Sequence, residues 1–148
     1  MADDLYHARV FELAGNIRHS GRLSAPQGTA TKVSRVCGSV VTVDVTLDDQ
    51  DRITAFAIEP RACALGQAAA AILADQAIGA HVDEIMAAHA ALRAMLKERA
   101  PPPGGRFWEL AHLKGVADYP PRHASTLLAF DAAIAAIAAA KQPAATTD

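Results

Sequence analysis

The strongest constraint on the fold of this 148-residue chain is an alternation of apolar and polar residues in the segment 41–47. Val41, Val43, Val45 and Leu47 are apolar, and a polar residue stands between each pair. This period of two predicts a strand with one face buried and the other in water. β-branched residues at 29–36 and a return of the pattern at 53–58 predict two more strands, so we expect a three-stranded antiparallel meander.

The rest of the chain has helical periodicity. Expected helices span residues 3–19, 62–79, 82–100, 107–113 and 122–140, and the proline-rich stretch 100–105 separates the third from the fourth. Because the later helices follow the strands instead of alternating with them, the predicted class is α+β. We expect a three-stranded antiparallel sheet preceded by one helix and covered by about four C-terminal helices, in a single domain 1–140 with a disordered tail 141–148.

The composition of the chain bears on its cellular compartment and on the classes of partner that it can bind. The formal net charge is −2 and the lysines and arginines are scattered, so we expect no nucleic-acid partner. The most apolar run, Ala132–Ala140, is short and follows Asp131, so no membrane role is expected. Two widely separated cysteines and an N-terminus without a cationic and apolar leader favour a cytoplasmic protein whose thiols are free or metal-bound.

The two cysteines are the candidate functional residues. Cys37 lies between two predicted strands, and Gly38 behind it leaves room for a reactant to approach the sulfur. Cys63 is predicted to begin a helix directly after a strand, where the helix dipole and Arg61 favour an ionised thiolate. Thiolates bind metal ions and accept sulfur, so we expect the two cysteines to do one or the other.

These features, read together with the run Leu110-x-x-Leu113-x-Gly115-Val116-x-x-Tyr119-Pro120-x-Arg122, resemble the U-type iron–sulfur cluster scaffold family of IscU, SufU and the N-terminal domain of NifU. The run is most similar to the SufU branch. The resemblance implies a SufE/NifU-like fold and a scaffold without catalysis. It also implies a transient [2Fe–2S] cluster or iron as cargo, with zinc as an alternative, a cysteine desulfurase as sulfur donor, and apo iron–sulfur proteins as recipients.

The chain departs from this family at two of the four expected ligands. The family's Cys-Gly-Asp is Cys37-Gly38-Ser39 here, and its third cysteine falls on Ser125. Serine is a poor substitute for a thiolate in iron–sulfur chemistry. His123 could complete a site with Cys37 and Cys63, two chains could pool their cysteines in a homodimer, or the protein could bind no cluster and act as a zinc-binding or metal-free adaptor that docks on assembly partners.

Other residues have weaker assignments. Arg122 matches a family arginine and could neutralise anionic thiolates, and a solvated arginine at a helix start is the equal alternative. His89 lies on the apolar stripe of its helix and is expected to be a partly buried packing residue. No local signature of a thiol hydrolase and no phosphate-binding glycine loop is present, so an enzyme is not expected.

Overall fold

The computed structural model describes residues 7–35 and 38–142. In chain order its elements are helix α2 (Ala8–Ala14), strands β1 (Gly28–Ser34), β2 (Ser39–Leu47) and β3 (Ile53–Arg61), helices α3 (Ala64–Ala77) and α4 (Val82–Glu98), the 3₁₀ segments η1 (Gly105–Asp118) and η2 (Pro120–Arg122), and helix α5 (His123–Ala140). The predicted α+β class and the order of strands before helices are confirmed.

The three strands form one antiparallel sheet in the order β1-β2-β3. Ser34 pairs with Ser39 at the turn end of the β1–β2 hairpin, and Val40 next to it pairs with Arg61 at the end of β3. The turn from β1 to β2 and the exit from β3 to α3 therefore lie at the same end of the sheet. Strand β3 extends past the predicted end and includes Pro60. An edge strand tolerates proline because the missing N–H group need not pair with a neighbour.

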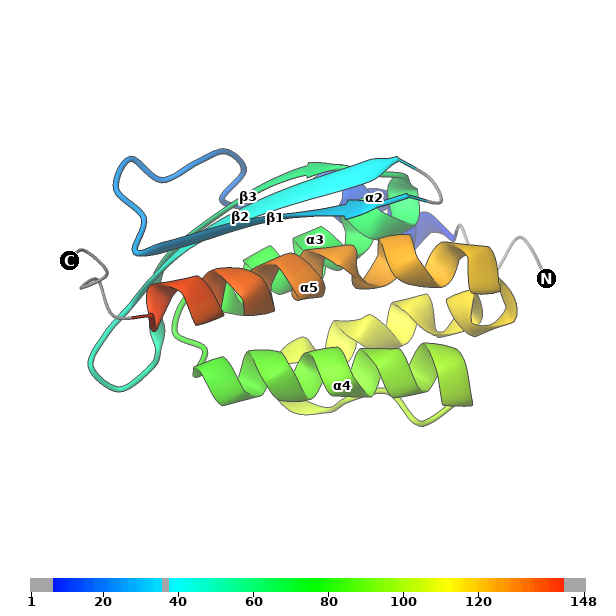
Figure 1. Cartoon of the computed structure of the whole chain (residues 1–148). Helices are drawn as coiled ribbons and strands as arrows, with labels where there is room; N and C mark the ends of the chain where they lie inside the picture. Colours follow the sequence, from blue (N-terminus) through cyan, green and yellow to red (C-terminus); the bar gives the residue numbers. More distant parts are fainter. Residues whose placement is uncertain (1–6, 36–37, 143–148) are drawn as a thin grey trace.

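Helices cover one face of the sheet in two layers (Figure 1). Helices α3 and α5 lie directly against the strands, and α4 and η1 pack beneath them. The inward residues of β2, Val41, Val43 and Val45, are buried against this layer. Their burial explains the period of two in the sequence, because the alternate residues of β2 face the opposite side.

Helix α5 is enclosed on most sides, and small residues allow it to approach the sheet closely. A side chain at Gly28 on β1 would overlap the carbonyl oxygen of Ala136 and would lie 2.5 Å from the backbone nitrogen of Ala140. Within the part of the chain that the structure describes, the stretch Pro120–Ala140 is long and apolar enough by composition alone to cross a membrane. Because 67% of its 18-residue apolar window is buried inside the protein, the apolar composition is accounted for by its position in the core.

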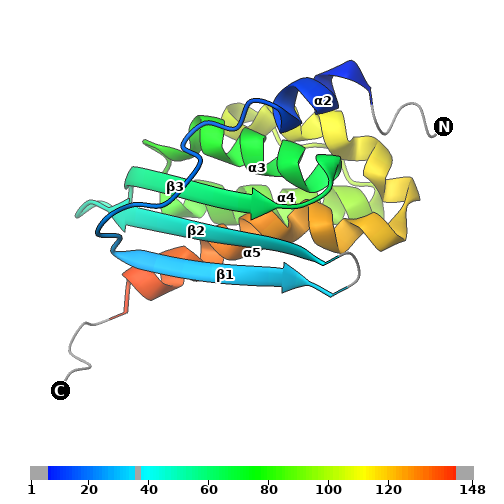
Figure 2. The same cartoon turned by 90° about the horizontal axis from the view of Figure 1, so that it is seen from above.

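The N-terminal part differs from the prediction. Helix α2 ends at Ala14, five residues before the expected end at 19. The following residues pair with β3 instead, because Ser20 forms a bridge to Ile58 and the Ile58 N–H donates to the His19 carbonyl oxygen at 3.0 Å. The segment between α2 and β1 then runs over the outer face of the sheet to the start of β1 (Figure 2).

The predicted short helix 107–113 is instead part of the longer 3₁₀ segment η1, and Phe107 interrupts its helical backbone with φ −105° and ψ 29°. The Phe107 ring is buried and packs edge-to-face on Phe130 of α5, with ring centroids 5.8 Å apart. This aromatic pair attaches the start of η1 to α5.

Candidate functional site

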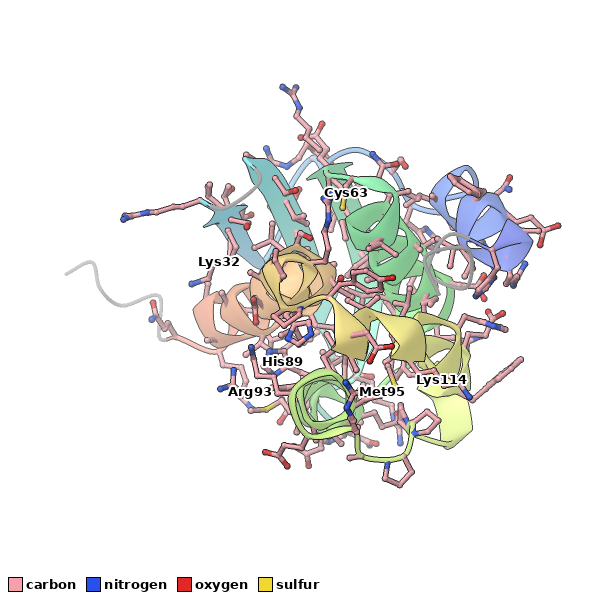
Figure 3. The ribbon with its side chains drawn as sticks, turned by 90° about the vertical axis from the view of Figure 1, so that its right-hand side faces the viewer. Lys32, Cys63, His89, Arg93, Met95 and Lys114 are labelled. Carbon is pink, nitrogen blue, oxygen red and sulfur yellow. The ribbon has the colours of Figure 1, made fainter. Side chains whose placement is uncertain are left out.

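Cys63 lies between the end of β3 and the first turn of α3. It is the N-cap residue of α3, with extended backbone angles (φ −68°, ψ 172°), and its carbonyl oxygen accepts from the Gln67 N–H at 2.9 Å. The side chain is partly exposed and forms no cap hydrogen bond. Figure 3 shows Cys63 at the end of the molecule where β3 gives way to α3. Its sulfur is therefore accessible beside the positive end of a helix dipole.

Ser125, in the first turns of α5, is the nearest polar partner of this thiol. Its Oγ lies 3.7 Å from Cys63 Sγ and donates a hydrogen bond to the Arg122 carbonyl oxygen at 3.2 Å. A hydroxyl has one proton and two lone pairs, so while Ser125 donates to the carbonyl it can still accept from the Cys63 S–H. Ser125 is 1% exposed, so its hydroxyl is shielded from water.

A glycine allows these two residues to meet. A Cβ at Gly66 of α3 would lie 3.0 Å from the Ser125 carbonyl oxygen and 2.8 Å from the Ala62 Cβ. These distances are shorter than ordinary van der Waals contacts. The close crossing of α3 and α5, and with it the contact between Cys63 and Ser125, therefore depends on the missing side chain.

His123 begins α5, and its ring bonds to the backbone of η1. It is 6% exposed, and its Nε2 donates to the Val116 carbonyl oxygen at 3.0 Å. A carbonyl can only accept, so Nε2 carries the proton and Nδ1 keeps the lone pair that a metal ion would need. Residues 7–35 and 38–142 contain no group of three or more His, Cys, Asp or Glu side chains placed to hold a metal ion.

The other predicted site residues lie at the same end of the molecule, apart from one that the structure does not describe. Ser39 is buried at the start of β2, opposite Ser34. Arg122 is partly exposed, and its carbonyl oxygen accepts from both Ser125 and Thr126. Cys37 lies outside the described residues. The ligand set proposed from the sequence therefore stays a prediction.

One polar pair was missed by sequence reasoning. His89 of α4, expected to be a packing residue, bonds through Nε2 to the Asp131 carboxylate of α5 at 2.7 Å. The pair lines a groove of about 320 Å³ that also includes Lys32 and Val33 of β1. No local motif could have found this pair, because 42 positions separate the two residues and only the packing of α4 on α5 brings them together.

Comparisons with known proteins agree with this architecture. The family model of the NifU-like N terminal domain matches residues 5–142. The crystal structure of a nitrogen-fixing NifU-like protein (N-terminal) from Brucella abortus has a TM-score of 0.93 and 45% sequence identity, and the match covers 97% of this chain and 99% of that chain.

Two further relatives are more distant. The iron–sulfur cluster assembly scaffold protein IscU of Streptococcus pyogenes serotype M1 is 27% identical over 86% of this chain and 79% of its own length. A SUF-system scaffold structure from Fervidobacterium islandicum AW-1 is 19% identical with a TM-score of 0.83 over 93% of this chain and 99% of that chain, which shows a shared fold. The chain belongs to the NifU-like N-terminal domain family of U-type iron–sulfur cluster assembly scaffolds.

Proposed function

We propose that this protein is a cytoplasmic, non-catalytic scaffold that accepts sulfur from a cysteine desulfurase and binds iron or a [2Fe–2S] cluster as cargo for apo iron–sulfur proteins. The observation that carries the proposal is the partly exposed Cys63 thiol at the N-terminus of α3. A sulfur acceptor needs an accessible sulfur in a setting that stabilises negative charge, and the helix N-terminus supplies such a setting.

Sulfur transfer at Cys63 would proceed by thiol–disulfide-type exchange. The Cys63 thiolate attacks the terminal sulfur of a persulfide on the desulfurase and forms a new S–S bond. The bond between that sulfur and the desulfurase cysteine breaks, and its electron pair leaves with the desulfurase thiolate. Cys63 then carries the persulfide, and no external oxidant or reductant is consumed.

Cargo binding requires further ligands. We propose Cys37 as the second thiolate and His123, through Nδ1, as the third ligand, with pooled cysteines in a homodimer as the alternative. Ser125 is a weaker ligand because its hydroxyl would have to release the proton it now donates to Arg122. Ser39 and the Arg122 guanidinium would act beside the ligands, the guanidinium by balancing thiolate charge.

One observation favours a second candidate function. The position 3.7 Å from Cys63 Sγ holds a hydroxyl instead of the family's third thiol. A protein that keeps the scaffold fold without this thiol could occupy the desulfurase surface as a zinc-binding or metal-free adaptor. Such an adaptor needs neither iron nor sulfide, so metal content separates the two functions.

The test is the iron and acid-labile sulfide content after anaerobic reconstitution with a cysteine desulfurase, followed by the visible spectrum. For the scaffold we expect comparable amounts of iron and sulfide with charge-transfer bands, and loss of both in Cys63→Ser. Ser125→Cys should increase cluster retention because it adds a thiol beside Cys63.

Ser20→Cys is the matched control for Ser125→Cys, because it adds a thiol on the segment beside β3, away from α5. Equal gains in the two variants would show that the position of Ser125 is irrelevant. Absence of iron and sulfide from the parent protein would overturn the scaffold proposal, and bound zinc or no metal would then support the adaptor.

A further inference from the structure

Three arginines without ion pairs among the described residues lie at the same end of the molecule as Cys63. Arg35 follows β1, Arg61 ends β3, and Arg122 precedes α5. Arg61 on β3 pairs through its backbone with Val40 of β2, which in turn pairs with Val33 of β1. Arg122 is linked through Ser125 to Cys63. Arg35 and Arg61 are exposed and Arg122 is partly exposed. None of the three guanidinium groups has a carboxylate partner within the part of the chain that the structure describes.

Six of the other arginines form ion pairs, namely Arg9, Arg18, Arg22, Arg52, Arg99 and Arg106. Of the carboxylates near the three arginines in sequence, Asp118 pairs with Arg99 at 2.7 Å, and the exposed Glu59 forms no ion pair with Arg61 among the described residues.

Two further cations lie on the helix layer. Figure 3, which looks at this end, labels Arg93 and Lys114 in the lower half of the picture, on the side of α4, and Cys63 in the upper half. Neither of these two side chains has an ion pair among the described residues. The whole chain has a formal net charge of −2, so these unpaired cations do not follow from an overall positive charge.

We infer that the arginines around Cys63 form a docking surface for an acidic patch on the protein that delivers sulfur. This inference rests on the proposed function and adds the chemistry of the partner's surface. Unpaired guanidinium groups can bind carboxylates with two hydrogen bonds each, and a field of one sign steers an oppositely charged partner toward the site.

An acidic protein surface fits better than a nucleic acid. Phosphate backbones are bound by continuous tracks of cations. Here the three arginines come from separate elements, the ends of β1 and β3 and the start of α5, and form no continuous track.

The primary experiment measures the association rate of the full chain with the cysteine desulfurase of its source organism. We expect the association rate to fall about tenfold in Arg61→Glu and about tenfold in the separate variant Arg35→Glu. The rate of the parent protein should also fall as NaCl rises from about 0.05 M to about 0.5 M. The matched control is Arg18→Glu, which makes the same charge change at an exposed arginine paired with Asp75 on α3. Circular dichroism verifies that each variant is folded.

The outcomes separate this inference from the proposed function. Binding and sulfur transfer that are unaffected by salt and by charge reversal at Arg35 and Arg61, or that respond equally to Arg18→Glu, would overturn the docking surface and leave the scaffold function standing. Sensitivity confined to the Arg35 and Arg61 variants would support it.

If no desulfurase binds, the proposed function itself fails, and a second probe then tests the docking surface on its own. The probe is a hexaglutamate peptide, titrated into isotopically labelled protein and followed by NMR. Shifts confined to residues around Arg35, Arg61 and Arg122 would support a surface for acidic protein. Absence of such shifts would overturn it, as would a stronger response at the same residues to a single-stranded oligonucleotide.

Discussion

At the scale of single residues, the carboxylate of Asp44 holds the segment between α2 and β1 on the outer face of the sheet. It is fully buried and accepts hydrogen bonds from the Arg22 guanidinium at 2.7 and 3.1 Å, from the Leu23 N–H at 2.9 Å and from the Thr29 hydroxyl at 2.7 Å. Burial opposes ionisation, but these donors outweigh it and hold the pKa of Asp44 below its usual range.

This buried ion predicts a pH-dependent stability. A carboxyl group with a lowered pKa in the folded state stabilises the protein fully above its ordinary value of about 3.9, and the contribution is lost as the pH falls through the lower folded value. Asp44→Asn should reduce the free energy of unfolding by about 2–4 kcal/mol at pH 7, because the charge-assisted bonds and the partner of Arg22 are lost. Its stability should also decline less than the parent's below about pH 4.

Urea unfolding at pH 7 and at about pH 3 measures both effects. Asp49→Asn is the control, because Asp49 is exposed. Asp44 would not have the proposed role if both variants lost the same stability, or if Asp44→Asn declined as steeply with acid as the parent.

At the scale of elements, the site depends on how α3 and α5 cross. Gly66 provides the space for that crossing, and Cys63 and Ser125 face each other as a result. Gly66→Ala should lower the free energy of unfolding by about 1–3 kcal/mol through overpacking. It should also move Ser125 away from the thiol, so we expect Cys63 to react faster with an aromatic disulfide reagent.

The reaction is followed in a Cys37→Ala background, so that Cys63 is the one thiol that reacts with the reagent. Gly104→Ala serves as the matched control, since a Cβ there has no atom within 4 Å. An unchanged thiol reaction rate in Gly66→Ala would mean that the crossing does not control access to Cys63.

Local sequence patterns predicted most elements but not their contacts. The alternation in β2 and the apolar period of α4 arise from burial of one face, so they can be read directly, whereas α3 and α5 are buried on most sides. The end of α2 could not be read in this way, because residues 19–21 pair with Ile58 on a strand far along the chain. The same limit applies to the site, where Cys63 meets Ser125 across 62 positions.

At the scale of the whole molecule, α5 joins the parts of the structure. It contacts β1, β2, α3 and α4, and it lies between the sheet and the outer helix layer in Figure 1. A helix that shares its buried surface with every layer cannot be lost without exposing the core. The fold should therefore behave as one cooperative unit, in line with the single domain predicted from the sequence.

Thermal or urea unfolding tests this cooperativity with two probes. Far-ultraviolet circular dichroism reports on the helices, and the near-ultraviolet signal reports on the surroundings of Trp108 and Tyr119 on η1 and beside it. We expect the two transitions to coincide. A near-ultraviolet transition that precedes the far-ultraviolet one would show that η1 unfolds separately.

The contact between Cys63 and Ser125 also has a consequence for oxidative stress. A second thiol 3.7 Å from Cys63 Sγ would be close enough for oxidation to join the two sulfurs after a small movement. A serine hydroxyl cannot form such a bond. Oxidation at this contact therefore cannot lock Cys63 in a disulfide with α5, and any sulfenic acid formed on Cys63 must be resolved by a thiol from elsewhere.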